Sequence, residues 1–279
     1  RCVDARPPTP LRSSRFRAQS TFSTVNTRWL DWSGVDAATW SSYVRDPSLA
    51  AAIAAANHPE LHQRLTRARV RGFCLRQNVH LELRAAAVMG WGRAGGKGYA
   101  HAPTLWAARH LWLPLLERLP HLSRKEAFRE FRALRSRGDL PGMGPAYFTK
   151  LIFFFGSGTG YILDKWLAAS VQVLNATHWT LDPNGLPVFT WRSSNFPKLN
   201  HQRTMVVDQV TSEEYERFCE ILEDLAPLLR LADGEAVEQL LFSSSTWRAF
   251  VREHCLSVKT STRSKLSQRG TSGRTPPPM

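Results

Sequence analysis

The chain has 279 residues, of which 43% are hydrophobic and 22% charged, a composition typical of a folded globular protein. It contains no run of about 18 consecutive apolar residues, so a membrane-spanning helix is not expected. Lysine and arginine outnumber aspartate and glutamate by 37 to 23, which gives a formal net charge of +14. Because most of these cations are arginines, whose planar guanidinium suits phosphate, nucleic acid is favoured over a membrane surface as the partner. A basic surface without such a partner is the alternative.

Both ends of the chain differ in composition from its middle. Residues 1–28 and 258–279 are rich in arginine, serine and proline and lack periodic apolar positions, so we expect a flexible basic arm and a disordered basic tail. Residues 29–257 have the periodic apolar pattern of a folded domain. The N-terminal stretch has no apolar core of signal-peptide length, which predicts a cytoplasmic location.

The cysteines and histidines give no sign of a metal or cofactor site. The four cysteines lie far apart and form no CxxC pair, so we expect neither a zinc knuckle nor a cysteine-bound iron–sulfur cluster, but reduced thiols. These residues are Cys2, Cys74, Cys219 and Cys255. His58 and His62 lie one helical turn apart, but a third ligand is not evident, and a solvated helix face is favoured. We therefore expect no cofactor.

The first half of the domain is expected to be helical. Asp46-Pro47 should start an alanine-rich helix that Asn57-His58-Pro59 ends. Apolar residues at helical spacing continue through 61–87, and another amphipathic stretch runs from Thr104 to Arg118. Between them, the glycine-rich segment 90–99 is expected to form a loop.

The second half adds further helices and one β-hairpin. A strongly basic helix is expected from Ser123 to Arg137. Residues His178–Leu181 and Leu186–Trp191 flank Asp182-Pro183-Asn184-Gly185, whose proline and Asn-Gly pair favour a hairpin turn. The pattern Thr211–Glu214 is a capping box before a C-terminal amphipathic helix. The sequence thus predicts a mainly α-helical fold with one small β-hairpin.

The most informative segment is Leu140-Pro141-Gly142-Met143-Gly144, which lies between the basic helix and an apolar helix that runs to Phe155. This order predicts a helix, a tight hairpin and a second helix over residues 124–155. Gly142 and Gly144 allow the backbone to approach a phosphate closely, and Pro145 suits the first helical position. The free amides around Met143 and the helix dipole are therefore expected to bind a DNA phosphate without regard to base sequence.

These residues resemble the helix-hairpin-helix DNA glycosylases, whose hairpin has the sequence L-P-G-[V/I]-G and whose catalytic aspartate follows in an apolar segment. Here Tyr161-Ile162-Leu163-Asp164-Lys165-Trp166-Leu167 matches that segment, and Asp164 lies 20 residues after Gly144. The match is local. Within the superfamily, the chain resembles in particular the bacterial branch with an 8-oxoguanine-glycosylase-like fold. The resemblance implies two lobes with a DNA-binding cleft between them. The cysteine quartet that binds an iron–sulfur cluster in some relatives is absent.

Asp164 is the first candidate catalytic residue. It follows the segment Gly156–Gly160 and precedes a helix, so the positive end of the helix dipole is expected to keep its carboxylate ionised. Cleavage of an N-glycosidic bond creates positive charge on the sugar, and a carboxylate beside that carbon can stabilise the charge or activate the attacking water. The alternative role of Asp164 is an N-terminal helix cap, and the two roles are compatible.

Lys150 is the second candidate catalytic residue. Relatives that also cut the DNA strand have a lysine nucleophile two residues after the second hairpin glycine, where this chain has Ala146. Lys150 lies one turn further along the same helix face and could extend inward. Because the usual position is not a lysine, we expect a monofunctional enzyme; the alternative role of Lys150 is phosphate binding. Lys165, directly after the aspartate, is expected to contact DNA.

Further contacts with DNA and with an extruded base are expected elsewhere. A base must leave the duplex before its glycosidic bond can be cleaved. Arg93 and Lys97 stand among the glycines of segment 90–99 and could clamp the DNA, although a flexible connector is an equal alternative. Trp91, in the same segment, and Trp166, beside the aspartate, are candidates for the wall of a base pocket.

Taken together, these features predict a DNA glycosylase that excises a modified base from double-stranded DNA and leaves an abasic site. The substrate is either an oxidised purine such as 8-oxoguanine or a hypermodified phage base such as glucosylated hydroxymethylcytosine, which would indicate an antiviral role. No membrane association and no obligate protein partner are expected. The alternatives are a noncatalytic helix-hairpin-helix DNA-binding module and a nuclease, although a nuclease would need clustered carboxylates to bind metal.

Overall fold

The computed structural model describes residues 34–94, 99–174, 178–181, 187–190 and 206–253. In this part of the chain the fold is mainly α-helical with one two-stranded sheet, which confirms the predicted fold class. The first helical elements are α2 (Ala37–Val44), α3 (Pro47–Ala55), η2 (Pro59–His62), α4 (Arg67–Cys74), α5 (Leu81–Gly92), α6 (Ala102–Ala107), α7 (Arg109–Arg118) and η4 (Leu119–His121). They are followed by α8 (Arg124–Arg137), α9 (Pro145–Phe155), α10 (Lys165–Leu174), β1 (His178–Leu181), β2 (Pro187–Thr190), α11 (Ser212–Leu229), α12 (Gly234–Ser243) and α13 (Ser245–Val251).

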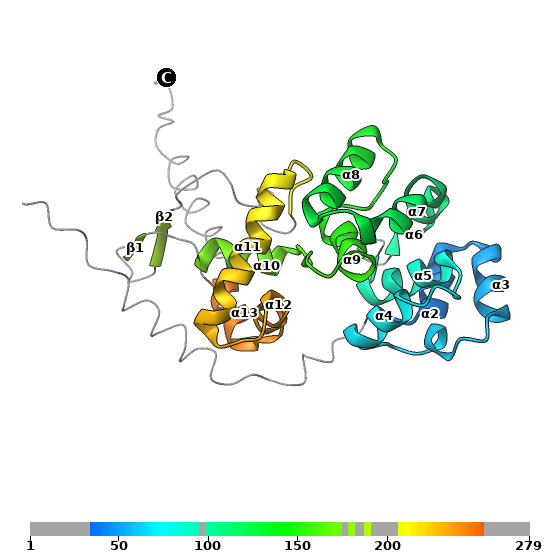
Figure 1. Ribbon diagram of the computed structural model, residues 1–279, viewed down its shortest axis with the longest axis horizontal. Coiled ribbons are helices and arrows are strands. Elements are labelled where there is room, and N and C mark those ends of the chain that lie inside the picture. The colour runs from blue at the N-terminus through cyan, green and yellow to red at the C-terminus, as the bar shows by residue number, and fades with distance from the viewer. Residues whose placement is uncertain (1–33, 95–98, 175–177, 182–186, 191–205, 254–279) are drawn as a thin grey trace, which may run out of the picture.

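Figure 1 shows two groups of helices with the α8–α9 pair between them. Helices α2 to α7 gather at one end, and α10 to α13 at the other. Helix α9 packs against α4, α5, α7 and α8, whereas α12 packs against α10, α11 and α13. The chain therefore places the predicted helix-hairpin-helix at the centre of the molecule, where the segment after α9 leads from one group of helices into the other.

Several predicted helix boundaries are confirmed by their caps. The Asp46 carboxylate accepts a hydrogen bond from the Ser48 amide at the start of α3, and α3 ends before Asn57-His58-Pro59. Capping boxes begin α8, at Ser123, and α11, at Thr211. Each such cap satisfies amide groups that the first helical turn leaves without a partner.

The glycine-rich segment is less of a loop than the sequence predicts, because α5 continues to Gly92. The reason lies in the chain before α2. The Val35 amide donates to the Gly90 carbonyl (3.1 Å), and a Cβ atom on Gly90 would lie 2.9 Å from the Val35 carbonyl oxygen. Trp40 Nε1 also donates to the Ala94 carbonyl (2.9 Å). These glycines thus permit close packing between distant segments, which local sequence does not reveal.

The stretch from Thr104 to Arg118 is two helices rather than one. Helix α6 ends at Ala107, α7 begins at Arg109, and the two meet at Ala108. Two buried tryptophans hold this junction: Trp112 Nε1 donates to the Leu105 carbonyl (3.3 Å), and its ring meets that of Trp106 edge-on at 6.1 Å. Helical periodicity continues across the junction, so the sequence pattern did not indicate a break.

An aromatic core joins the central helix pair to α11. The Phe128 ring of α8 stacks on the Tyr215 ring of α11 (4.5 Å between centroids), and the Phe131 ring stacks on Phe148 of α9 (5.4 Å). All four rings are almost fully buried. Such aromatic contacts contribute stability beyond their buried area, so they fix α9, and the hairpin before it, in the fold.

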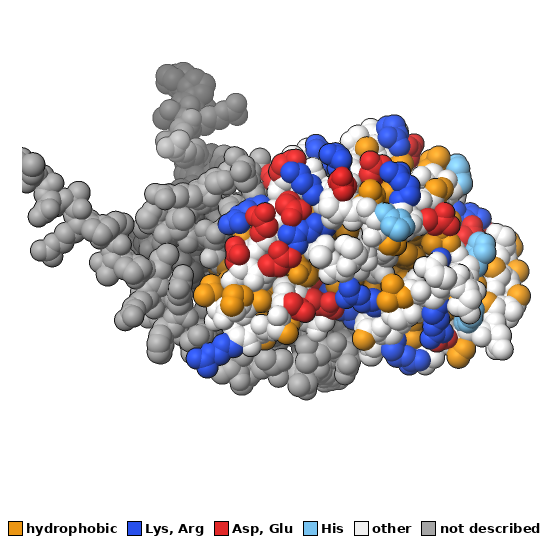
Figure 2. Space-filling model, in the orientation of Figure 1, with side chains coloured by type: hydrophobic (Ala, Val, Ile, Leu, Met, Phe, Trp, Pro, Cys, Tyr) orange, Lys and Arg blue, Asp and Glu red, His pale blue; other side chains and the backbone are white. Residues whose placement is uncertain are grey.

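The surface over this region is of mixed charge. In Figure 2, acidic and basic side chains alternate where α8 and α11 lie. Arg124 of α8 forms ion pairs with Glu216 (2.8 Å) and with Glu223, both on α11. The net positive charge of the chain is thus not gathered into one patch on this face.

Among the described residues, none of the helices has the length and apolarity needed to cross a membrane. Cys74 and Cys219 are free, buried thiols, while Cys2 and Cys255 lie outside the described part of the chain. Burial raises the pKa of Cys219 to about 12. Within the described ranges there is also no group of three His, Cys, Asp or Glu side chains that could hold a metal ion.

Candidate active site

The turn between α8 and α9 has the geometry of a tight hairpin. Gly142 adopts a positive φ of 72°, and the Met143 amide donates to the Leu140 carbonyl (3.2 Å). Gly144 precedes α9, and Pro145 is its first residue, as the sequence predicts. The Met143 amide is thus already occupied and its side chain is fully buried, so the expected phosphate contact cannot use Met143.

An ion pair that the sequence did not reveal supports the hairpin. Arg135 of α8 donates from Nη1 to the Leu140 carbonyl (2.7 Å) and from Nη2 to Asp208 Oδ2 (2.8 Å). A Cβ atom on Gly144 would lie 3.3 Å from Asp208 Oδ1. The Asp208 carboxylate therefore lies directly against the hairpin at Gly144.

The hairpin geometry gives a test of stability. Alanine in the left-handed conformation costs about 1–2 kcal/mol. We expect Gly142→Ala to lose more than this, because its Cβ would also lie 2.7 Å from the His101 Cβ atom. Gly138→Ala is the matched control, since Gly138 has a φ of 85° but no neighbouring atom within 4 Å of a Cβ. Urea unfolding measures both; equal losses would show that the His101 contact is unimportant.

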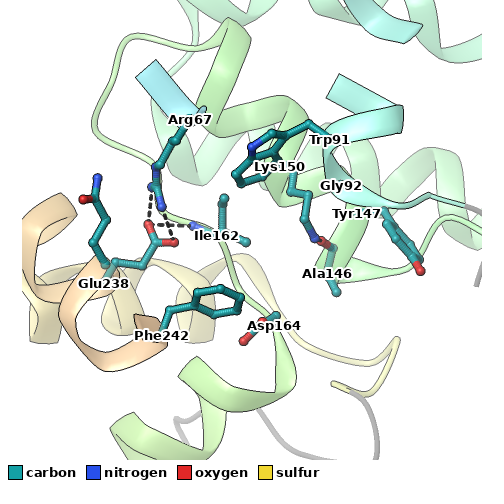
Figure 3. Close-up of a pocket in the computed structure, with 11 residues that line it drawn as sticks. Arg67, Trp91, Gly92, Ala146, Tyr147, Lys150, Ile162, Asp164, Glu238 and Phe242 are labelled. Carbon is teal, nitrogen blue, oxygen red and sulfur yellow. Dashed lines mark hydrogen bonds and ion pairs between the residues drawn. The ribbon is translucent and has the colours of Figure 1, made fainter. Parts of the chain in front are cut away.

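Directly after the hairpin, a cavity of about 230 Å³ opens between α4, α5, α9 and α12 (Figure 3). Its polar lining residues are Arg67, Lys150, Asp164, Glu238 and Gln239. The other lining residues are Trp91, Gly92, Ala146, Tyr147, Ile162 and Phe242. The cavity is slightly smaller than the roughly 300–1,000 Å³ of sites for drug-sized ligands.

Lys150 extends from α9 back along its own helix into this pocket. Its ammonium donates to the Ala146 carbonyl, one helical turn earlier, so the amine lies beside position 146. Gly92 makes room for the side chain, because a Cβ there would lie 2.7 Å from Lys150 Cδ. Loss of solvation lowers the pKa of Lys150 to about 8, although the nearby carboxylates of Asp164 and Glu238 act in the opposite direction.

Asp164 lies at the start of α10 and caps it. Its Oδ1 accepts hydrogen bonds from the amides of Trp166 (2.8 Å) and Leu167 (2.9 Å). Burial raises the pKa of Asp164, although these amides and the Lys150 charge favour the ionised form. The amides at the helix start favour the ionised carboxylate, as the sequence predicts, but desolvation outweighs them, so the net direction of the pKa is upward.

The irregular segment between α9 and α10 places Asp164 in the same pocket as Lys150. Thr149 of α9 accepts a hydrogen bond from the Leu163 amide (3.0 Å) and donates to the Pro145 carbonyl (2.7 Å). From α11, the Tyr215 hydroxyl donates to the Tyr161 carbonyl (2.8 Å). These bonds fix the backbone just before Asp164 against α9 and α11, and the two candidate catalytic groups line one pocket.

One of three comparisons with known proteins gives a match. A family model described as "Putative 8-oxoguanine DNA glycosylase OGG-like protein" matches residues 29–242. The chain belongs to this family. No curated protein and no solved structure matches it. The range matched by the OGG-like family includes the hairpin, Lys150 and Asp164, and it ends at Phe242 of the pocket. Membership supports assignment to the DNA glycosylases at the general level.

Two predicted site residues of this OGG-like chain lie outside the pocket. The Trp166 ring faces cations instead: Arg248 Cζ lies 4.6 Å and Arg252 Cζ 5.5 Å from its centroid. Lys165 Nζ lies 5.3 Å from the same ring. The structure therefore does not place Trp166 in the base pocket, because the helix that Asp164 caps turns this side chain towards α13. Trp91, by contrast, does line the pocket.

The predicted DNA clamp is only partly described. Arg93 ends α5 in the left-handed conformation and is exposed, with Nε donating to the Tyr99 hydroxyl (3.3 Å). The Tyr99 ring is buried and stacks on Tyr43 at 4.1 Å, so it is not free to stack on a base. Lys97 lies outside the described residues.

The sequence did not indicate the second pair of charged residues in the pocket, Arg67 and Glu238. Arg67 donates to both carboxylate oxygens of Glu238, at 3.0 and 2.6 Å, across 171 positions of sequence. Tyr147, Gln239 and Phe242 complete this region. One signal was present in the sequence: Glu238 interrupts the apolar pattern of Val237, Leu240 and Leu241 on α12 and is only 1% exposed. A buried acid of this kind requires a partner.

Proposed function

We propose that the chain is a DNA glycosylase that extrudes a modified base from double-stranded DNA and hydrolyses its N-glycosidic bond, leaving an abasic site. The observation that carries the proposal is that Asp164 and Lys150 line one pocket directly after the helix-hairpin-helix. Family membership supports the same class of activity. The enzyme would act in the cytoplasm, as the sequence predicts, and would require no cofactor.

The two side chains can carry complementary steps of the hydrolysis. The Asp164 carboxylate accepts a proton from water as the water oxygen attacks C1′ of the sugar. The C1′–N bond breaks, its electron pair stays on the base, and the Lys150 ammonium donates the proton that neutralises the leaving nitrogen. The carboxylate also stabilises the positive charge that develops on the sugar in the transition state. The products are the free base and an abasic site.

The hairpin and nearby cations would hold the DNA backbone. Gly142 and Gly144 give the close approach that a phosphate contact needs, and Pro145 places the start of α9 beside it. Arg93 and Lys97 are proposed as further phosphate contacts, with Lys165 next to the catalytic carboxylate. Trp91, on the pocket wall, is proposed as a surface for the extruded base.

We propose an oxidised purine, with 8-oxoguanine as the first candidate, as the substrate. The cavity of about 230 Å³ fits a single base better than a base that carries a sugar. The glucose of glucosylated hydroxymethylcytosine would have to project through the pocket mouth. Release of that base would instead assign the enzyme to defence against phage DNA.

A second candidate mechanism uses Lys150 as the nucleophile. Its amine lies beside position 146, where relatives that cut the strand have their lysine, and its lowered pKa gives a neutral fraction near pH 8. The neutral amine would attack C1′ and displace the base, then lose a proton and open the sugar to a Schiff base. Elimination of the 3′ phosphate from that imine would cut the strand.

The test uses duplexes with one 8-oxoguanine, one hydroxymethylcytosine or one glucosylated hydroxymethylcytosine. Mass spectrometry measures the released base, and alkali reveals abasic sites. We expect release of 8-oxoguanine with no strand break before alkali. Trapping of the protein on DNA by borohydride would instead establish the amine mechanism. Binding of DNA without release of any base would favour a noncatalytic DNA-binding module. Strand cleavage that EDTA abolishes would indicate a nuclease.

A further inference from the structure

Arg67 and Glu238 are charged residues of the pocket lining to which the proposed hydrolysis gives no role. Figure 3 shows them on one side of the pocket, with Lys150 and Asp164 on the other. A base attached to a sugar near Asp164 would therefore direct its far edge towards the Arg67–Glu238 pair.

The pair is held rigidly. The Arg67 guanidinium lies 3.8 Å from the centroid of the Phe153 ring, and its Nε is 3.3 Å from Glu235 Oε1. Glu238 Oε2 also accepts the Ile162 amide (3.4 Å). The side chains are 12% and 2% exposed. Groups fixed in this way recognise a ligand without a large loss of conformational entropy.

Stability does not explain the pair. A buried ion pair often contributes no more than apolar residues of the same volume, because desolvation of both charges offsets their attraction. Glu238 also shares the pocket with the Asp164 carboxylate, and burial raises the pKa of both acids. A well-packed apolar wall would avoid this cost, so the pair is better explained by recognition.

The pair offers a hydrogen-bond donor next to an acceptor. A guanidinium has five N–H donors, and within the described part of the chain Arg67 directs two of them at Glu238, whereas its Nε lies 3.3 Å from Glu235 Oε1 without forming a hydrogen bond. The carboxylate has about four lone-pair positions, and Glu238 uses three in the described residues. One acceptor position on Glu238 and three donors on Arg67 therefore remain without a hydrogen-bond partner in the described residues.

We propose that Arg67 and Glu238 determine base specificity by recognising a lactam edge, in which a ring N–H lies next to a carbonyl group. Glu238 accepts the ring N–H, and Arg67 donates to the carbonyl oxygen. The inference rests on the proposed function, and between its two candidate substrates it favours 8-oxoguanine, which has N1–H next to C6=O. Cytosine derivatives have an amine and an unprotonated ring nitrogen at this edge instead.

The decisive comparison is between 8-oxoguanine and 1-methyl-8-oxoguanine, whose methyl group replaces the ring N–H. We expect the full chain to release the methylated base more slowly by a factor on the order of 10⁴, because polar sites reject ligands that leave their groups unpaired. In a thermal-shift assay that needs no catalysis, free 8-oxoguanine should raise the melting temperature and its methylated form should not.

Three variants separate recognition from folding. Glu238→Gln should reduce the discrimination, because glutamine can donate as well as accept. The double variant Arg67→Met with Glu238→Leu replaces the ion pair by an apolar wall, and it should fold even if Glu238→Gln does not. We expect it to release 8-oxoguanine less than about tenfold faster than the methylated base, which is the effect of one methyl group in an apolar pocket. Glu216→Gln, which alters the ion pair with Arg124 outside the pocket, should keep the discrimination of the original chain.

The outcomes distinguish this inference from the proposed function. Equal release of both bases, or preferential release of glucosylated hydroxymethylcytosine, would overturn lactam recognition while leaving the glycosylase in place. No release of any base, together with selective thermal stabilisation by 8-oxoguanine, would remove the enzymatic function but retain the recognition site. Discrimination that is unchanged in the double variant would show that Arg67 and Glu238 are structural.

Discussion

Replacement of Asp164 by asparagine is expected to slow base release by a factor of about 10²–10⁴, the range typical of a lost general base. Asparagine is as good a helix cap as aspartate, so the hydrogen bonds from the Trp166 and Leu167 amides to the side-chain oxygen can persist. The change therefore removes the charge while the start of α10 keeps its geometry. Single-turnover release of 8-oxoguanine from a duplex measures the effect on the chemical step.

Asp233→Asn is the matched control for this experiment. Asp233 caps α12 in the same way, by accepting the Ala236 amide (2.8 Å), and it is exposed outside the pocket. We expect it to release base at the original rate and to melt at a similar temperature. If Asp164→Asn also released base at the original rate, Asp164 would be a cap only, and the enzymatic proposal would fail.

The local elements of this fold were predictable because their signals are local. The capping boxes at Ser123 and Thr211, the Asp46-Pro47 helix start and the hairpin glycines each act within a few residues. The continuation of α5 to Gly92 was not predictable. It depends on contacts with residues before α2, and no pattern within α5 encodes them.

The site was predictable only in part, for the same reason. Asp164 and Lys150 follow from a motif and from helix spacing, and the structure places both in one pocket. Arg67 and Glu238 come from distant helices, and only a buried acid among apolar neighbours hinted at a partner. Trp166 was predicted to line the base pocket because it is close to Asp164 in sequence. Its ring instead faces Arg248 outside the pocket, because residues close in sequence can point in different directions.

The pH dependence of base release is expected to separate the two roles of Lys150. In the proposed hydrolysis Lys150 donates a proton as the ammonium, so the rate should fall as pH rises through about 8, where the group loses its proton. If the amine attacks C1′, only the neutral form reacts, and the rate should rise through the same pH. The hydrolysis also needs ionised Asp164, so its rate should fall at acid pH, below a pKa that burial raises.

Lys150→Met and Lys150→Arg establish which group titrates. Methionine removes the proton donor and should slow release by about 10²–10⁴, and the change in rate near pH 8 should disappear. Arginine keeps a positive charge but does not lose its proton in this range, so the rate of base release by Lys150→Arg should also not change near pH 8. If the rate of base release by Lys150→Met still changed near pH 8, the titrating group would be a residue other than Lys150. Borohydride trapping that persists in both variants would exclude Lys150 as the nucleophile, because neither variant has its amine.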